Sequence, residues 1–205
     1  MAHFFNNILR CLLLISSFIK IPGIKETLTV IPVLNAGLAV VTSSVVLLMA
    51  EKPTFCVISA EFTIALVAIC ETAGRIAGST LTIFPLKKVK LTNAIKIILA
   101  LIIILFSGII AQNIHIVLTA LFFASLWTGC VDPKMGALIF NNLDKTKLAT
   151  AFGGMTTYFQ LGDIISKILF SILILCFPAK ITAGVYMFIT ALSLGYITFQ
   201  DKVKQ

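Results

Sequence analysis

The stretch LTNAIKIILALIIILFSGIIA, residues 91–111, decides the fold. Lys96 is its single charged residue, and it lies within the first two turns of the helix that the stretch would form. A helix of about 20 apolar residues crosses the hydrocarbon core of a bilayer, which is about 30 Å thick. Residues 91–111 are therefore predicted to be a transmembrane helix.

Composition extends this prediction to the whole chain. Of its 205 residues, 59% are hydrophobic and 12% are charged, and the mean hydropathy is +1.08. Soluble domains carry about 25% charged residues. The net charge of +8 comes with lysines clustered in short loops, without the basic stripe that binds nucleic acid. We therefore expect an integral membrane protein, with the lipid bilayer and not nucleic acid as its surroundings.

Further apolar runs of sufficient length for a span flank the first one. They cover residues 54–84, 114–140, 148–177 and 181–199. Together with the first fifty residues they predict an all-α, multi-span helical bundle of about six transmembrane helices. We expect this bundle to form a single transmembrane domain over residues 1–205.

The first fifty residues allow two arrangements. Hydropathy favours a span over 27–50 and allows a short one over 8–24 before it. Alternatively, one long helix over 8–34 ends near Pro32, and residues 37–50 form an interfacial or re-entrant segment. Prolines and a glycine in this region would kink any helix through it.

Lysines in alternate loops predict the orientation. Short cytosolic loops of membrane proteins carry an excess of lysine and arginine. Here the lysine-rich connections and the chain end alternate with connections that are poor in charge, and they hold Lys87, Lys88, Lys90, Lys145, Lys147, Lys202 and Lys204. We therefore expect a cytosolic C-terminus, and the plasma membrane as the location.

Charged residues inside the predicted spans are the main indication of function. Glu71 and Arg75 lie four residues apart and so share one face of a helix, and Glu61 falls on roughly the same face. Charges in the membrane are costly, so they face the protein interior or a water-filled cavity and usually have a partner. The pair is therefore either a structural staple between helices or part of a polar site.

The helix over 148–177 repeats this pattern with Asp163 and Lys167. Its preceding turns carry hydroxyl and amide side chains, and the 114–140 helix adds Trp127, with Asp132 and Lys134 near its inner end. Long charged side chains near a helix end commonly snorkel to the interface. The candidate substrate-binding residues are therefore Glu71, Arg75, Trp127, Thr157, Gln160 and Asp163.

Small residues within the spans predict close helix packing. Gly74 and Gly78 form a G-x-x-x-G motif, which lets two helices approach closely, and Gly153 and Gly154 are the corresponding candidates on the later helix. The cysteines are scattered through apolar runs without metal-ligand spacing, and neither histidine lies well inside a span. We expect no enzyme activity, no metal and no cofactor.

Four segments resemble the equilibrative nucleoside transporter family. ETAGR at 71–75 resembles its acidic-x-x-Gly-Arg signature on the eighth helix, and ETLTVIP at 26–32 resembles the end of its seventh. LFFASLWTGCVDPKM at 121–135 resembles the tenth helix, and KLATAFGGMTTYFQLGDIISKIL at 147–169 resembles the eleventh. The chain differs in having Glu71 where the family has aspartate, and Ala68 where it has asparagine.

This resemblance implies one half of a major-facilitator-like transporter, helices seven to eleven, with the family's N-terminal six-helix half absent. It favours the long first helix over 8–34, and residues 181–199 have no counterpart in it. It also implies facilitated diffusion of nucleosides or nucleobases by alternating access, with Glu71 and Arg75 binding the substrate. Such a half would work with a second copy or with a second transporter half.

Two other functions remain open from the sequence. One is a different polar-solute carrier of the major-facilitator type, in which Glu61, Glu71 or Asp163 would titrate to couple transport to protons. The other is a non-transporting membrane partner subunit that packs through Gly74 and Gly78.

Overall fold

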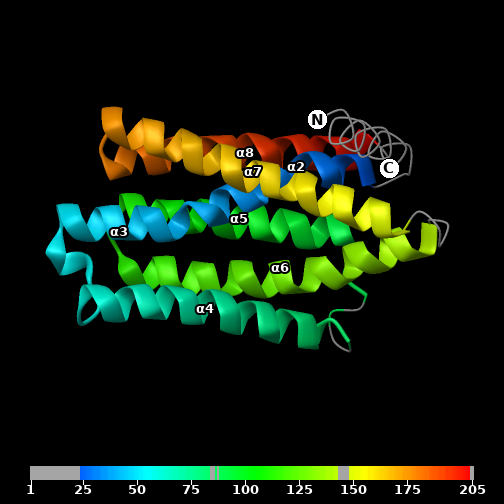
Figure 1. Cartoon of the computed structure of the whole chain (residues 1–205), viewed down its shortest axis with the longest axis horizontal. Helices are drawn as coiled ribbons and strands as arrows, with labels where there is room; N and C mark the ends of the chain where they lie inside the picture. Colours follow the sequence, from blue (N-terminus) through cyan, green and yellow to red (C-terminus); the bar gives the residue numbers. More distant parts are fainter. Residues whose placement is uncertain (1–23, 84–85, 87, 143–147, 204–205) are drawn as a thin grey trace, which may run out of the picture.

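The computed structural model describes residues 24–83, 86, 88–142 and 148–203, and every regular element in this part is helical. The elements are α2 (Ile24–Ala39), α3 (Val41–Glu51), η1 (Pro53–Phe55), α4 (Ala60–Leu81), α5 (Leu91–Ile110), α6 (Ile114–Asn142), α7 (Leu148–Cys176) and α8 (Ala179–Val203) (Figure 1). Six helices are long and apolar enough to cross a membrane, with α2 and α3 together supplying one of them, Thr29–Glu51. The chain is therefore an all-α, multi-pass integral membrane protein.

The beginning of the described chain differs from one of the two expected arrangements. A helix that ends near Pro32 is wrong, because Pro32 lies inside α2 and the chain continues through Val40 into α3. Neighbouring helices compensate for the hydrogen bond that a proline removes, so transmembrane helices tolerate it. Residues 37–50 are not a separate re-entrant segment, since Thr29–Glu51 has the length and composition of a span. The expected helix residues 8–23 lie outside the described part of the chain.

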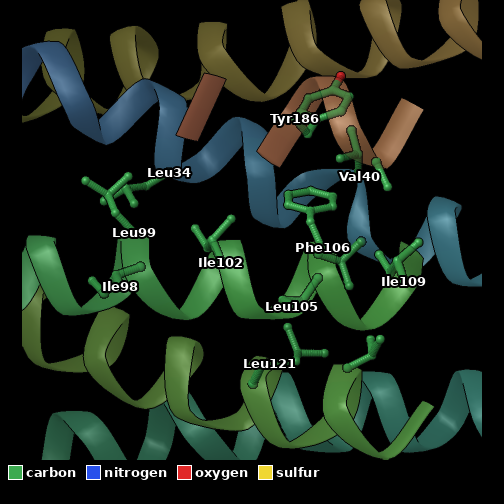
Figure 2. Packing of buried hydrophobic residues seen from close by; sticks show 14 of the residues in the cluster. Leu34, Val40, Ile98, Leu99, Ile102, Leu105, Phe106, Ile109, Leu121 and Tyr186 are labelled. Carbon is green, nitrogen blue, oxygen red and sulfur yellow. The ribbon is translucent and has the colours of Figure 1, made fainter. Parts of the chain in front are cut away.

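α5 occupies the centre of the bundle. It packs against α6 on one side and against α8 and α2 on the other. Figure 2 shows its side chains Ile98, Leu99, Ile102 and Leu105 within this core, and the Phe106 ring stacks on Tyr186 of α8 with 5.7 Å between centroids. Because lipid tails are as apolar as these side chains, close van der Waals contact holds the helices together.

α4 lies at one edge of the bundle and packs closely on α6 (Figure 1). A Cβ atom added at Gly74 would lie 2.5 Å from the Phe122 carbonyl oxygen, and one added at Gly78 would lie 1.8 Å from the Leu126 carbonyl oxygen. From the other side, Gly129 of α6 faces the Arg75 carbonyl in the same way, at 2.3 Å. The three glycines let the two backbones touch.

Within the described bundle, close packing of α7 does not occur at Gly153, which was predicted for it together with Gly154. A Cβ at Gly153 would meet no heavy atom within 4 Å among the residues that the structure describes, so Gly153 makes no close helix contact there. Gly154 is buried. Close approach instead occurs at Gly162, where a Cβ would lie 2.5 Å from the carbonyl oxygen of Pro32 on α2.

Polar contacts tie the connections at both ends of the bundle. At the end where α3 stops, Glu51 Oε1 accepts a hydrogen bond from the backbone N–H of Ala179 at 3.1 Å and so caps α8. At the opposite end, Lys96 pairs with Asp201 of α8. Lys134 does not snorkel freely, because its ammonium donates to the carbonyls of Leu86, at 2.7 Å, and Val89 in the α4–α5 connection.

Candidate functional site

A charged pair lies at the middle of α4. Arg75 Nη2 is 3.2 Å from Glu71 Oε1, one helical turn away. The side chains are 44% and 39% exposed, so neither is buried against a neighbouring helix. An intrahelical staple alone does not explain their place, because a mid-span charge that faces lipid is unfavourable by several kcal/mol.

A second charged pair lies in the central turns of α7. Lys167 Nζ is 3.2 Å from Asp163, and these side chains are 59% and 35% exposed. Each pair has its acid four residues before its base, but α4 and α7 are connected by an odd number of reversals and run in opposite directions (Figure 1). The acid-to-base direction along the bundle axis is therefore opposite in the two pairs.

Both pairs line the same cavity. It has a volume of about 440 Å³ and lies between α2, α3, α4 and α7. Beyond the four charged residues, its lining consists of Asn35, Leu38, Ala39, Thr42, Phe159 and Gln160. We call this the central cavity. Because its charges sum to zero, it offers hydrogen-bond donors and acceptors without a net electrostatic field for an ion.

The central cavity brings together four of the six residues that the sequence proposed. Glu71, Arg75, Gln160 and Asp163 line it. On α7, the spacing of three and four residues between Gln160, Asp163 and Lys167 keeps these side chains on one face.

The other two proposed residues lie elsewhere. Trp127 is partly buried, and its ring packs against the apolar core and does not line the cavity. Thr157 precedes Asp163 by six residues and so points to another face of α7, where its hydroxyl donates to the Gly153 carbonyl at 2.9 Å. Glu61 is exposed in the first turn of α4, far along the helix from the pair that it was expected to join, and does not line the cavity.

Sequence reasoning missed part of the lining. Asn35 and Thr42 come from α2 and α3, where the helix boundaries were ambiguous, and the amide of Asn35 in an apolar run was the signal available. Lys167 was recognised as a partner of Asp163 but was not proposed as a binding residue. Phe159 carries no sequence signal of its own, since most phenylalanines of such a chain face lipid or core.

The lining of the central cavity offers many hydrogen-bonding groups to a ligand. Arginine and lysine donate hydrogen bonds, carboxylates accept them, and the amides of Asn35 and Gln160 do both. Within the described residues, no group of three or more histidine, cysteine or acidic side chains could hold a metal ion. The site is therefore suited to a small polar molecule with several donors and acceptors.

Comparisons with known proteins add no assignment. No family model, no curated protein and no solved structure matches the chain.

Proposed function

We propose that the chain is a facilitative carrier of neutral polar solutes, with nucleosides or nucleobases as the substrate class. One observation carries this proposal: two oppositely directed ion pairs from α4 and α7 face one cavity at mid-span. Ionisable residues within a membrane span mark solute and ion pathways by default. The resemblance of residues 71–75 to the nucleoside transporter signature supplies the substrate class.

The size and chemistry of the central cavity are compatible with such a solute. Its volume of about 440 Å³ falls within the range of small-molecule sites, roughly 300–1,000 Å³. A nucleobase edge presents alternating donors and acceptors, and the sugar adds hydroxyls that a guanidinium or a carboxylate can bind. A phosphorylated solute would place two negative charges beside Glu71 and Asp163 without a compensating excess of cations.

We also propose that the chain acts with a partner that covers the cavity. The spans in α4 and α7 are the least buried of the described bundle, since only 17% and 11% of their most apolar windows lie inside it. The charged side chains between them remain partly exposed. Lipid cannot solvate these charges. We propose that a second copy of the chain or a second transporter half covers them, and that the two bodies alternate access to the cavity.

Uptake by the purified chain in liposomes tests the proposed function. We expect saturable uptake of radiolabelled uridine or adenosine that unlabelled nucleoside inhibits, and no uptake of uridine monophosphate. Uptake should not depend on a pH gradient; a strict dependence on one would favour the proton-coupled carrier. Absence of nucleoside binding and uptake, with the chain folded and crosslinked only to a larger membrane protein, would favour the non-transporting partner subunit.

We further propose that the end of the bundle bearing Lys88, Lys90 and Lys202 faces the cytosol at the plasma membrane. The even number of spans puts both ends of the described chain on this side. A tag after Gln205 that can be stained in intact cells would contradict this orientation.

A further inference from the structure

The central cavity lies between two other hollows and shares two lining residues with each of them. A groove of about 570 Å³ shares Thr42 and Lys167 with it and extends along α3 and α7 to Ala50 and Ile174. A smaller chamber of about 160 Å³ shares Asn35 and Phe159 with it. We call these the Glu51-side groove and the C-terminal chamber, after the end of the bundle that each one approaches.

The residue numbers along two helices place the three hollows in a line. On α2 and α3, the lining moves from Ile31 in the C-terminal chamber, through Leu38, to Val46 in the Glu51-side groove. α7 runs in the same direction as α2 and α3. Its lining residues follow the same order, from Thr156 in the C-terminal chamber to Ile174 in the Glu51-side groove. The order along both helices therefore places the C-terminal chamber, the central cavity and the Glu51-side groove one after another along the bundle axis.

The hollow nearest the C-terminal end is the smallest of the three. The groove and the central cavity have volumes typical of small-molecule sites, whereas the C-terminal chamber has room for only about five waters at about 30 Å³ each. It is nevertheless polar on one wall, which Thr128 and Asp132 of α6 provide.

The boundary between the central cavity and the C-terminal chamber includes two residues that line both hollows. Asn35 of α2 and Phe159 of α7 belong to both. Asn35 Nδ2 donates to the Phe159 carbonyl at 3.5 Å, which is a long hydrogen bond and therefore a weak one. Because this bond ends on the backbone carbonyl, it does not restrain the Phe159 ring, and rotation of the ring about χ1 would change the boundary between the two hollows.

We propose that Asn35 and Phe159 form a gate, and that its opening joins the central cavity to the C-terminal chamber as one passage to the C-terminal end. The inference rests on the proposed function, in which the central cavity holds the solute. The structure then represents the state that is open toward the Glu51 side and closed by Phe159. Asp132 and Thr128 line the next polar position that the solute reaches after the gate.

Thiol labelling from each side of the membrane tests the gate without any solute. The background is the full chain with its five cysteines replaced by alanine. Thr128→Cys reports on the C-terminal chamber, and Thr42→Cys reports on the junction of the groove and the central cavity. A membrane-impermeant methanethiosulfonate is applied to intact cells and to inside-out vesicles from the same cells.

We expect opposite labelling of the two reporters while Phe159 is present. Thr42→Cys should react only from the Glu51 side, and Thr128→Cys only from the C-terminal side. Adding Phe159→Ala should make Thr128→Cys reactive from both sides, whereas Phe159→Leu, which keeps most of the bulk, should not. Asn35→Ala, which removes the other member of the gate, should also allow labelling from the Glu51 side.

Three outcomes would overturn the gate. They are labelling of Thr128→Cys from the Glu51 side with Phe159 present, no change upon Phe159→Ala, and no labelling of Thr128→Cys from the C-terminal side. Labelling of Thr42→Cys from the Glu51 side at the parental rate shows that each variant is folded. Uridine uptake is measured in parallel: the expected labelling without uptake would defeat the proposed function and keep the gate.

Discussion

Gly78→Ala is expected to separate α4 from α6 and to destabilise the protein more than any other single methyl addition at the described glycines. The new Cβ would lie 1.8 Å from the carbonyl oxygen and 2.7 Å from the carbonyl carbon of Leu126. These are backbone atoms of a helix and cannot rotate away, so α4 itself has to move. Overpacking typically costs 1–3 kcal/mol and occasionally more, and we expect the upper end of about 3 kcal/mol here.

The matched control for this prediction is Gly153→Ala. Both changes add one methyl group to a helical glycine, but the Cβ at Gly153 meets open space. Because alanine favours a helix over glycine by about 0.8–1.0 kcal/mol, this variant should be as stable as the parent or more so. Thermal unfolding of the purified chain in detergent measures both. Equal melting temperatures for Gly78→Ala and the parent would contradict the backbone contact.

Displacement of α4 has a second consequence that the same variant can report. Gly74, Gly78 and Gly129 set the position of the α4 backbone next to α6, and Arg75 is the residue whose carbonyl Gly129 faces. A shift of α4 therefore moves Glu71 and Arg75 within the central cavity. We attribute to these glycines the precise placement of the charged pair as well as stability.

Exchanging the charges of α4, by Glu71→Arg combined with Arg75→Glu, is expected to weaken nucleoside binding more than tenfold while leaving the fold intact. The double variant keeps an i, i+4 ion pair and a neutral cavity, so it leaves no isolated charge in the membrane. It reverses donor and acceptor positions, so a solute loses at least one charged hydrogen bond. Such a bond contributes about 1.5–3 kcal/mol, which corresponds to more than tenfold in Kd.

The control for the exchange is a second ion pair outside the cavity. Lys96→Asp combined with Asp201→Lys reverses the pair between α5 and α8 at the C-terminal end of the bundle. This variant should bind radiolabelled uridine like the parent. The single change Arg75→Ala should abolish uptake while membrane insertion persists. Parental affinity in the Glu71 and Arg75 exchange would show that these residues do not bind the solute.

The membrane class and most of the spans were predictable from the sequence, because each depends on the length of an apolar run alone. The runs 91–111 and 114–140 closely match α5 and α6. The apolar run 27–50 likewise predicted the span Thr29–Glu51, and only the alternative, a helix that ends near Pro32, was wrong. Pro32 suggested a stop, but the cost of a proline depends on the neighbours that surround it, and here α7 packs against it through Gly162.

The candidate site was predictable where a helix carries its own signal. Charged pairs at i, i+4 identify one face of α4 and one of α7, and both faces line the central cavity. What the sequence does not contain is the rotation of each helix relative to its neighbours. For this reason the sequence grouped Trp127 with residues that line the central cavity, which Trp127 does not, and it did not point to Asn35 and Phe159.

The opposed directions of the two ion pairs have a consequence for energy coupling. Each pair is neutral, and along the bundle axis the direction from Glu71 to Arg75 is opposite to that from Asp163 to Lys167. A rearrangement that carries all four groups together moves almost no net charge through the membrane voltage, which acts with about 2.3 kcal/mol per charge per 100 mV. Flux of an uncharged solute through this bundle would follow its concentration gradient at any membrane potential, in either direction.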